Sequence, residues 1–277
     1  MGIAVSPVET WLAEILADPI TKQPTDVKSF PTKDAILDAR VFLKNTKGFT
    51  EWEDGQKYYE QWEASSKGYN ASVENYRIEI ERDRPTYEHV VMSGRILDVG
   101  GGCGTVREFL PDTVQYVSVD PYAAVLTQVP APKERAYSCL KRPLSFLAAC
   151  AEFLPFTAWS FDWVHMRSVI DHVQIPDLAL IEANRVLRDD GQLLVGLSVE
   201  GGKSGIVTGK ERLKHATKGI LSAIGQPQYV DHHTFHPTLA NLVKLITSNR
   251  FEVQDIYWQP GWNNSVCYVT AKKAPRH

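Results

Sequence analysis

The sequence contains no long apolar run, and no stretch approaches the roughly 20 residues that a membrane-spanning helix needs. Its first residues lack the basic segment leading into an apolar one that marks a secretion signal. Charge is nearly balanced, with 30 basic and 33 acidic side chains and a net charge of −3, which argues against a dedicated nucleic-acid-binding protein. We therefore expect a cytoplasmic protein that acts on neither membranes nor nucleic acids.

Cysteine is scarce, and its spacing excludes two kinds of site. The four cysteines form no C-x-x-C pair and no metal-binding spacing, so we expect reduced thiols: Cys103, Cys139, Cys150 and Cys267. The rest of the composition, 43% apolar and 23% charged, is ordinary for a globular protein. A chain of 277 residues can hold one large α/β domain with an addition, as a monomer or a homodimer.

The central stretch is residues 95–110, RILDVGGGCGTVREFL, in which an apolar strand runs through a glycine-rich turn into a helix-compatible segment. Such a turn lets the backbone take positive φ and lets a phosphate or nucleoside approach closely. The turn lacks the third glycine of the dinucleotide-binding pattern G-x-G-x-x-G, because Thr105 and Arg107 stand at that position in the two registers. This disfavours a dehydrogenase. The residues instead fit acidic-x-G-x-G-x-G, with Asp98, Gly100, Gly102 and Gly104.

A second strand, residues 116–119, ends in Asp120. An acidic side chain at this strand end, about 20 residues after the glycine turn, is placed to accept hydrogen bonds from both ribose hydroxyls of a nucleoside. We expect Asp120 and its neighbours Pro121 and Tyr122 to bind the cofactor.

The glycine turn resembles motif I of the class I S-adenosylmethionine (SAM) dependent methyltransferases. Two further strings, AEFLPF at 151–156 and FDWV at 161–164, are similar to those of the ubiquinone/menaquinone-biosynthesis-like group. The resemblance covers about residues 85–273 and implies SAM as the cofactor, with S-adenosylhomocysteine as the product. These relatives usually carry an aspartate on the adenine amino group where this chain has Cys150. The resemblance therefore shifts the adenine contact to the backbone around Ala151 and Glu152, and it adds Met166 and Arg167 at the end of the fourth strand.

Strands and helices alternate after Arg95, which predicts a doubly wound, mostly parallel sheet. The resemblance implies seven strands, of which the last is antiparallel. Residues 91–277 would form this SAM-binding domain, with an acceptor-side insertion at 201–235. Residues 1–90 show no clear strand series and predict a helical extension or lid, with helices at 7–17, 32–43 and 72–91. Seven aromatic residues in the stretch 49–76 suit either the core of this cover or the lining of an acceptor pocket.

Histidine supplies the candidate base. In SAM-dependent transfer the sulfonium already activates the methyl group, but a hydroxyl acceptor must lose its proton as the bond forms. We identify His172, His233 and His236 as candidates, while His172 suits a packing role equally well. The cluster DHHTFH at 231–236 has no separated fourth ligand and no H-x-x-x-H spacing, so we expect no metal. The sequence favours O-methylation of a sugar or secondary-metabolite hydroxyl; N- or C-methylation, or SAM binding without turnover, are the alternatives.

Overall fold

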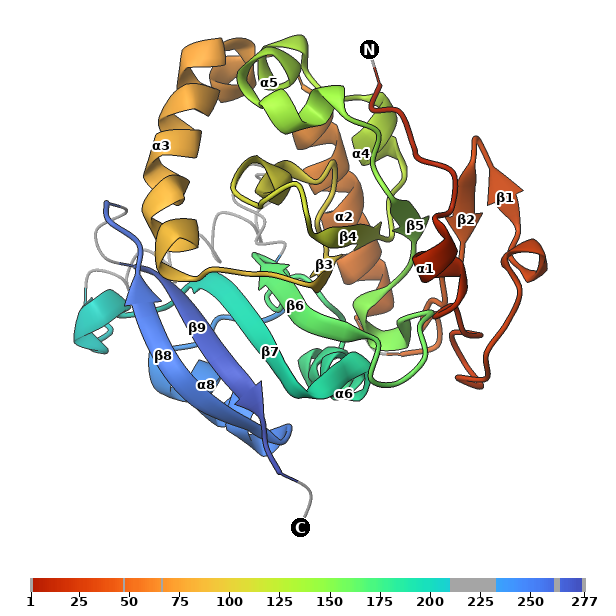
Figure 1. Cartoon of the computed structure of the whole chain (residues 1–277). Helices are drawn as coiled ribbons and strands as arrows, with labels where there is room; N and C mark the ends of the chain where they lie inside the picture. The colour runs from red at the N-terminus through yellow and green to blue at the C-terminus, as the bar shows by residue number, and fades with distance from the viewer. Residues whose placement is uncertain (1, 47, 66, 210–232, 262–264, 276–277) are drawn as a thin grey trace.

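A computed structural model describes residues 2–46, 48–65, 67–209, 233–261 and 265–275. Within these ranges the chain forms one nine-stranded sheet with the order β1-β2-β5-β4-β3-β6-β7-β9-β8 (Figure 1). The strands are β1 Thr32–Lys33, β2 Ile36–Asp38, β3 Arg95–Val99, β4 Gln115–Asp120, β5 Phe146–Ala148, β6 Phe161–Arg167, β7 Leu187–Ser198, β8 Phe251–Trp258 and β9 Val266–Lys273.

The predicted doubly wound sheet is confirmed. Strands β5, β4, β3, β6 and β7 pair in parallel, and β9 pairs antiparallel with both β7 and β8. Because parallel strands align their carboxyl ends, the glycine turn after β3, Asp120 at the end of β4 and the segment after β6 meet at one edge of the sheet. This edge is the crevice where an open α/β sheet binds its ligand.

The predicted helix at 32–43 is wrong, and a β-hairpin takes its place. Asp34 and Ala35 form the turn with φ of 52° and 64°, and β2 adds in parallel to β5 with Leu37 opposite Leu147. The two consecutive apolar residues are buried on opposite faces of the sheet, Ile36 in one core cluster and Leu37 in the other. That alternation is the strand period, so the hairpin extends the expected seven strands to nine.

The helices differ from the predictions near the N-terminus and after the glycine turn. The helix predicted at 7–17 is reduced to one turn, and the glycine turn leads into a 3₁₀ turn, Thr105–Glu108, instead of a long helix. The predicted helix at 72–91 is present as α3, with the Ser72 hydroxyl as its N-cap. The α-helices are α1 Thr10–Ala13, α2 Phe49–Ala64, α3 Val73–His89, α4 Ala124–Thr127, α5 Ala131–Ala136, α6 Pro176–Val186 and α8 Leu239–Ser248. Of these, α2, α4 and α5 were not predicted.

Each face of the sheet has its own apolar core. Helices α1, α6 and α8 bury their apolar side chains against one face, and α3 covers the other face (Figure 1). Strand β6 shows the alternation, because Val164 and Met166 enter the first core and Trp163 enters the second. No helix in the described ranges is both long enough and apolar enough to cross a lipid bilayer.

Candidate functional site

The glycine turn has the geometry of a ligand cradle. Gly100, Gly102 and Gly104 all have positive φ, at 64°, 50° and 74°. A side chain at Gly100 would overlap Val169, whose Cγ2 would lie 2.5 Å from the added carbon, so the loop after β6 packs directly on the turn. At Gly102 an added carbon would meet nothing within 4 Å. The turn is therefore closed toward the protein and open at Gly102, where a ligand can approach the backbone.

Asp98 lies beneath this turn and is only 3% exposed. Its Oδ1 is 2.7 Å from Nδ1 of His165, and its other oxygen accepts a hydrogen bond from the Tyr116 hydroxyl at 2.5 Å. Burial, with the Asp98 carboxylate close by, raises the pKa of Tyr116 well above its ordinary value, so its hydroxyl is the donor. His165 and Tyr116 were not among the predicted site residues, although both stand on strands beside Asp98. Asp98 thus supports the turn from below.

Asp120 stands at the carboxyl end of β4, where its Oδ1 accepts the backbone N–H of Tyr122 at 2.9 Å. Arg40, which the sequence reasoning missed, follows β2 and donates to the Pro121 carbonyl at 3.2 Å. It also pairs with Asp38 at 2.6 Å. The helical interpretation of 32–43 hid Arg40, because the strand that precedes it forms only by pairing with the distant strand β5.

The AEFLPF string forms a short 3₁₀ turn, Ala151–Phe153, after β5. Glu152 is 4% exposed and accepts the backbone N–H groups of Gln174 and Ile175 at 2.8 and 3.3 Å. Burial raises the pKa of Glu152. Through these two hydrogen bonds its carboxylate stabilises the loop that follows β6. Cys150 is also buried, which raises the pKa of its thiol to about 12 and keeps it neutral.

Met166 and Arg167 end strand β6 with side chains that point to opposite faces. The Met166 side chain is fully buried in the apolar core. The Arg167 guanidinium lies 2.6 Å from the buried Asp83 carboxylate of α3. Both side chains thus have structural partners within the fold.

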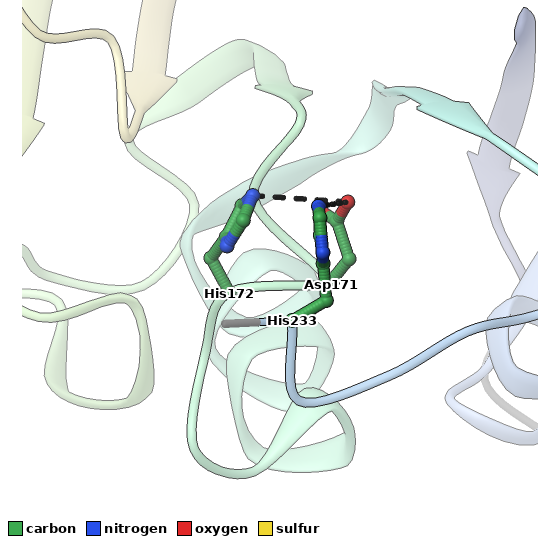
Figure 2. Close-up of side chains that lie close together, drawn as sticks. All are labelled: Asp171, His172 and His233. Atoms are coloured by element: carbon green, nitrogen blue, oxygen red, sulfur yellow. Dashed lines mark ion pairs between the residues drawn. The ribbon is translucent and has the colours of Figure 1, made fainter. Parts of the chain in front are cut away.

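Two segments far apart in the chain bring an acid and two histidines together (Figure 2). Nε2 of His172 and Nε2 of His233 lie 3.8 and 3.9 Å from Oδ2 of Asp171. The two imidazole rings are 4.6 Å apart between centroids. We call Asp171, His172 and His233 the Asp–His cluster. Asp171 and His172 follow Val169, the residue that touches the glycine turn, by two and three positions.

Helix α2 and Thr234 hold the Asp–His cluster in place. The Trp52 ring N–H and the Gln56 amide donate to the His172 carbonyl at 2.6 and 2.9 Å. The Thr234 backbone N–H donates to the Asp171 carbonyl at 2.7 Å, and its hydroxyl donates to the Val173 carbonyl at 2.6 Å. The backbones on both sides of the cluster are thereby tied together.

Two more rings lie beside the cluster. Tyr59 of α2 packs edge-on to His172 with centroids 4.5 Å apart, and His236 is 5.4 Å from His233. The aromatic stretch of α2 thus covers the histidines, and all three predicted histidine candidates occur in one place. His232 and residues 210–231 of the predicted insertion lie outside the described residues.

Known proteins share this fold and these motifs. Residues 97–195 match the family described as "Methyltransferase domain". An uncharacterized methyltransferase of Schizosaccharomyces pombe is 31% identical over 110 residues, which are 38% of this chain and 40% of that protein. A ubiquinone/menaquinone biosynthesis C-methyltransferase of Rhizobium etli is 38% identical over 106 residues, 36% of this chain and 40% of that protein. The chain thus spans about 40% of the length of these curated relatives.

A solved SAM-dependent methyltransferase of Thermotoga maritima overlays with a TM-score of 0.51 at 19% identity, over 81% of this chain and 98% of that one. At this identity the likeness shows the fold alone, which is the Rossmann-like methyltransferase fold. The family match adds evidence from the sequence itself. Residues 97–195 are similar to a methyltransferase domain, and the chain has distant relatives in the ubiquinone/menaquinone group of SAM-dependent methyltransferases. SAM is the methyl donor typical of this family.

Proposed function

We propose that this protein transfers a methyl group from SAM to a small molecule, most favourably to a hydroxyl oxygen. The glycine turn with its open side at Gly102, together with Asp120 at the next strand end, supports the cofactor half of the proposal. In this proposal Ala151 and Pro121 contribute backbone, and Asp98 acts from beneath the turn.

The observation that carries the oxygen acceptor is the Asp–His cluster. Its members Asp171 and His172 stand after β6, on the loop that packs against the glycine turn through Val169, and therefore close to where the methyl group would be presented. Imidazole exchanges protons near neutral pH, which a hydroxyl acceptor needs and a neutral amine does not. N-methylation of a neutral amine needs no base and therefore does not need such a cluster.

The proposed step is a direct displacement. The acceptor oxygen attacks the methyl carbon, the C–S bond breaks with its electron pair going to sulfur, and S-adenosylhomocysteine forms. The hydroxyl proton passes to one of the three neighbouring histidines, His172, His233 or His236, and then to solvent. The protein contributes alignment and exclusion of water, because the sulfonium is already activated.

C-methylation is the second candidate, because the Rhizobium etli relative is named as a C-methyltransferase. It too needs a proton removed from the acceptor, so the histidines alone do not distinguish it from O-methylation. The position of the new methyl group in the product distinguishes C-methylation from O-methylation.

The test combines binding and turnover. Calorimetry with SAM, S-adenosylhomocysteine and NAD should give binding to the first two, and preferential NAD binding would overturn the proposal. Incubation with ¹³C-methyl SAM and pooled sugars, phenols, quinols and amines, followed by mass spectrometry and NMR of the products, identifies the methylated atom. We expect a methyl ether.

The matched variants are His172→Ala and His89→Ala. His89 also pairs with an aspartate, Asp255, but in an exposed position on α3. We expect His172→Ala to lower turnover at least about 100-fold with unchanged S-adenosylhomocysteine binding, whereas His89→Ala should keep full turnover. Equal turnover in both variants would remove the base assignment and leave the cofactor assignment standing.

A further inference from the structure

We infer that Asp171, His172 and His233 form a binding site for one divalent transition-metal ion, of which Zn²⁺ is the reference case. The three residues each offer a ligand atom, and these atoms all lie within 4.8 Å of one another (Figure 2). Sequence reasoning expected no metal because the histidines at 231–236 lacked a separated partner. The fold supplies that partner from the loop after β6.

The first observation that points to a cation is the state of the Asp171 carboxylate. The residue is only 8% exposed, and its Oδ1 is buried without a hydrogen-bond partner among the described residues. The histidine nitrogens, at 3.8 and 3.9 Å from Oδ2, are beyond hydrogen-bond distance. A buried carboxylate is costly unless it is paired, hydrogen-bonded or bound to a metal. A cation bound to this carboxylate, through Oδ2 or through both oxygens, would neutralise its buried charge.

The spacing is close to that of a coordination shell. Tetrahedral Zn²⁺ with bonds of about 2.0–2.1 Å places neighbouring ligand atoms about 3.3–3.4 Å apart. Small rotations of the side chains would shorten the observed N–O separations of 3.8 and 3.9 Å to this value. His233 is the more exposed of the two histidines, with 38% of its side chain exposed.

The surrounding contacts hold the ligands in place before an ion arrives. Trp52 and Gln56 fix the His172 carbonyl, and Thr234 ties the backbone next to His233 to the carbonyls of Asp171 and Val173. These contacts fix the backbone from which the ligand side chains project.

The donor set defines the class of ion. Two imidazoles and one carboxylate suit Zn²⁺, Co²⁺, Ni²⁺ or Fe²⁺, and the absence of thiolate disfavours Cu⁺. Three protein ligands leave at least one position for an oxygen ligand, as in catalytic zinc sites. The role of the ion rests on the proposed function: a metal-bound acceptor hydroxyl would lose its proton more readily. With His172 and His233 as ligands, His236 is the neighbouring imidazole that can accept this proton.

The experiment measures the ion without any turnover. Full-length protein is stripped with a chelator, dialysed, and titrated with Co²⁺ by visible absorption and with Zn²⁺ by calorimetry, with neither SAM nor acceptor present. We expect one ion per chain with a tetrahedral or five-coordinate Co²⁺ spectrum. Asp171→Asn, His172→Ala and His233→Ala should each weaken the Kd at least about tenfold.

His89→Ala is the matched control, because His89 and Asp255 form a histidine–aspartate pair to which no other described residue adds a third ligand. It should bind as tightly as the wild type. Each variant must also bind S-adenosylhomocysteine, which shows that it is folded. Unchanged Co²⁺ affinity in the three cluster variants, or an octahedral spectrum that His89→Ala abolishes, would overturn the inference.

A parallel turnover assay on stripped and Zn²⁺-loaded protein separates the two proposals. Stoichiometric Co²⁺ binding without methyl transfer would leave the metal site standing and overturn the function. Methyl transfer that no chelator affects, in protein that binds no Co²⁺, would overturn the metal site and leave the proposed function standing.

Discussion

Nδ1 of His165 lies 2.7 Å from Oδ1 of Asp98, and the pair is buried directly beneath the glycine turn. A side chain at Gly101 would come within 2.4 Å of the same carboxylate, so the turn lies tightly on Asp98. The hydroxyl of Tyr87, on α3, is 3.1 Å from the far nitrogen of His165. Motif I is therefore connected through a chain of buried polar groups to the helix that covers the sheet.

Asp98→Asn should damage both the fold and the cofactor site. Removing one charge of a buried, hydrogen-bonded pair should lower the free energy of unfolding by about 2–4 kcal/mol, and the loosened turn should bind S-adenosylhomocysteine more weakly. Urea denaturation and calorimetry measure the two effects. Asp112→Asn, which alters an exposed carboxylate paired with Arg142, is the control and should change neither. A stable variant with full affinity would contradict the supporting role of Asp98.

The parallel core and its motifs could be predicted because each carries a strong local signal. Strand β6 has the predicted bounds at Phe161–Arg167, and α3 at Val73–His89 lies within the helix predicted at 72–91. These features depend on residues near one another in the sequence.

The missed features depend on contacts between distant segments. Ile36 and Leu37 became a strand because β5 offered an unpaired edge, which no local pattern records. The partnership of His165 with Asp98 and that of Asp171 with His233 likewise arise only when separate strands and loops meet.

Asp120→Ala should weaken S-adenosylhomocysteine binding by at least about tenfold, because hydrogen bonds from two ribose hydroxyls to a carboxylate contribute about 1.5–3 kcal/mol each. Arg40→Ala should have a smaller effect, since Arg40 donates to the Pro121 carbonyl and so acts by positioning the segment after Asp120. Calorimetry at constant ionic strength gives both affinities, with Asp112→Ala as the control. A larger loss of S-adenosylhomocysteine affinity in Arg40→Ala than in Asp120→Ala would contradict the assignment of Asp120 as the ribose-binding residue.

Trp52→Phe should lower kcat about tenfold while leaving the KM for SAM unchanged. The substitution keeps an aromatic ring in a site that is 5% exposed, but it removes the N–H that donates to the His172 carbonyl at 2.6 Å. His172 would then be held by Gln56 alone on that side. Trp159→Phe, at a residue that is 47% exposed, is the control. A change in KM for SAM with constant kcat would mean that Trp52 serves the cofactor instead.

Glu152→Gln should become progressively more stable than the wild type as the pH rises. Burial raises the pKa of Glu152 above its ordinary value of 4.5, so the folded protein binds this proton more tightly than the unfolded chain does. The stabilisation from protonated Glu152 is complete below the ordinary value and is lost as the pH rises through the folded value. Glutamine keeps an oxygen that can accept the Gln174 N–H and has no charge to bury.

The measurement is the difference in the free energy of unfolding between variant and wild type at about pH 4 and at about pH 7.5, by urea denaturation. The difference should shift toward the variant at the higher pH. Glu81→Gln is the matched control, because Glu81 is exposed and pairs with Arg84 at the surface, so its difference should stay nearly constant. If both variants follow the same pH dependence, the two backbone N–H groups at Gln174 and Ile175 fully compensate the buried charge, and Glu152 fastens the loop after β6 as an ordinary carboxylate.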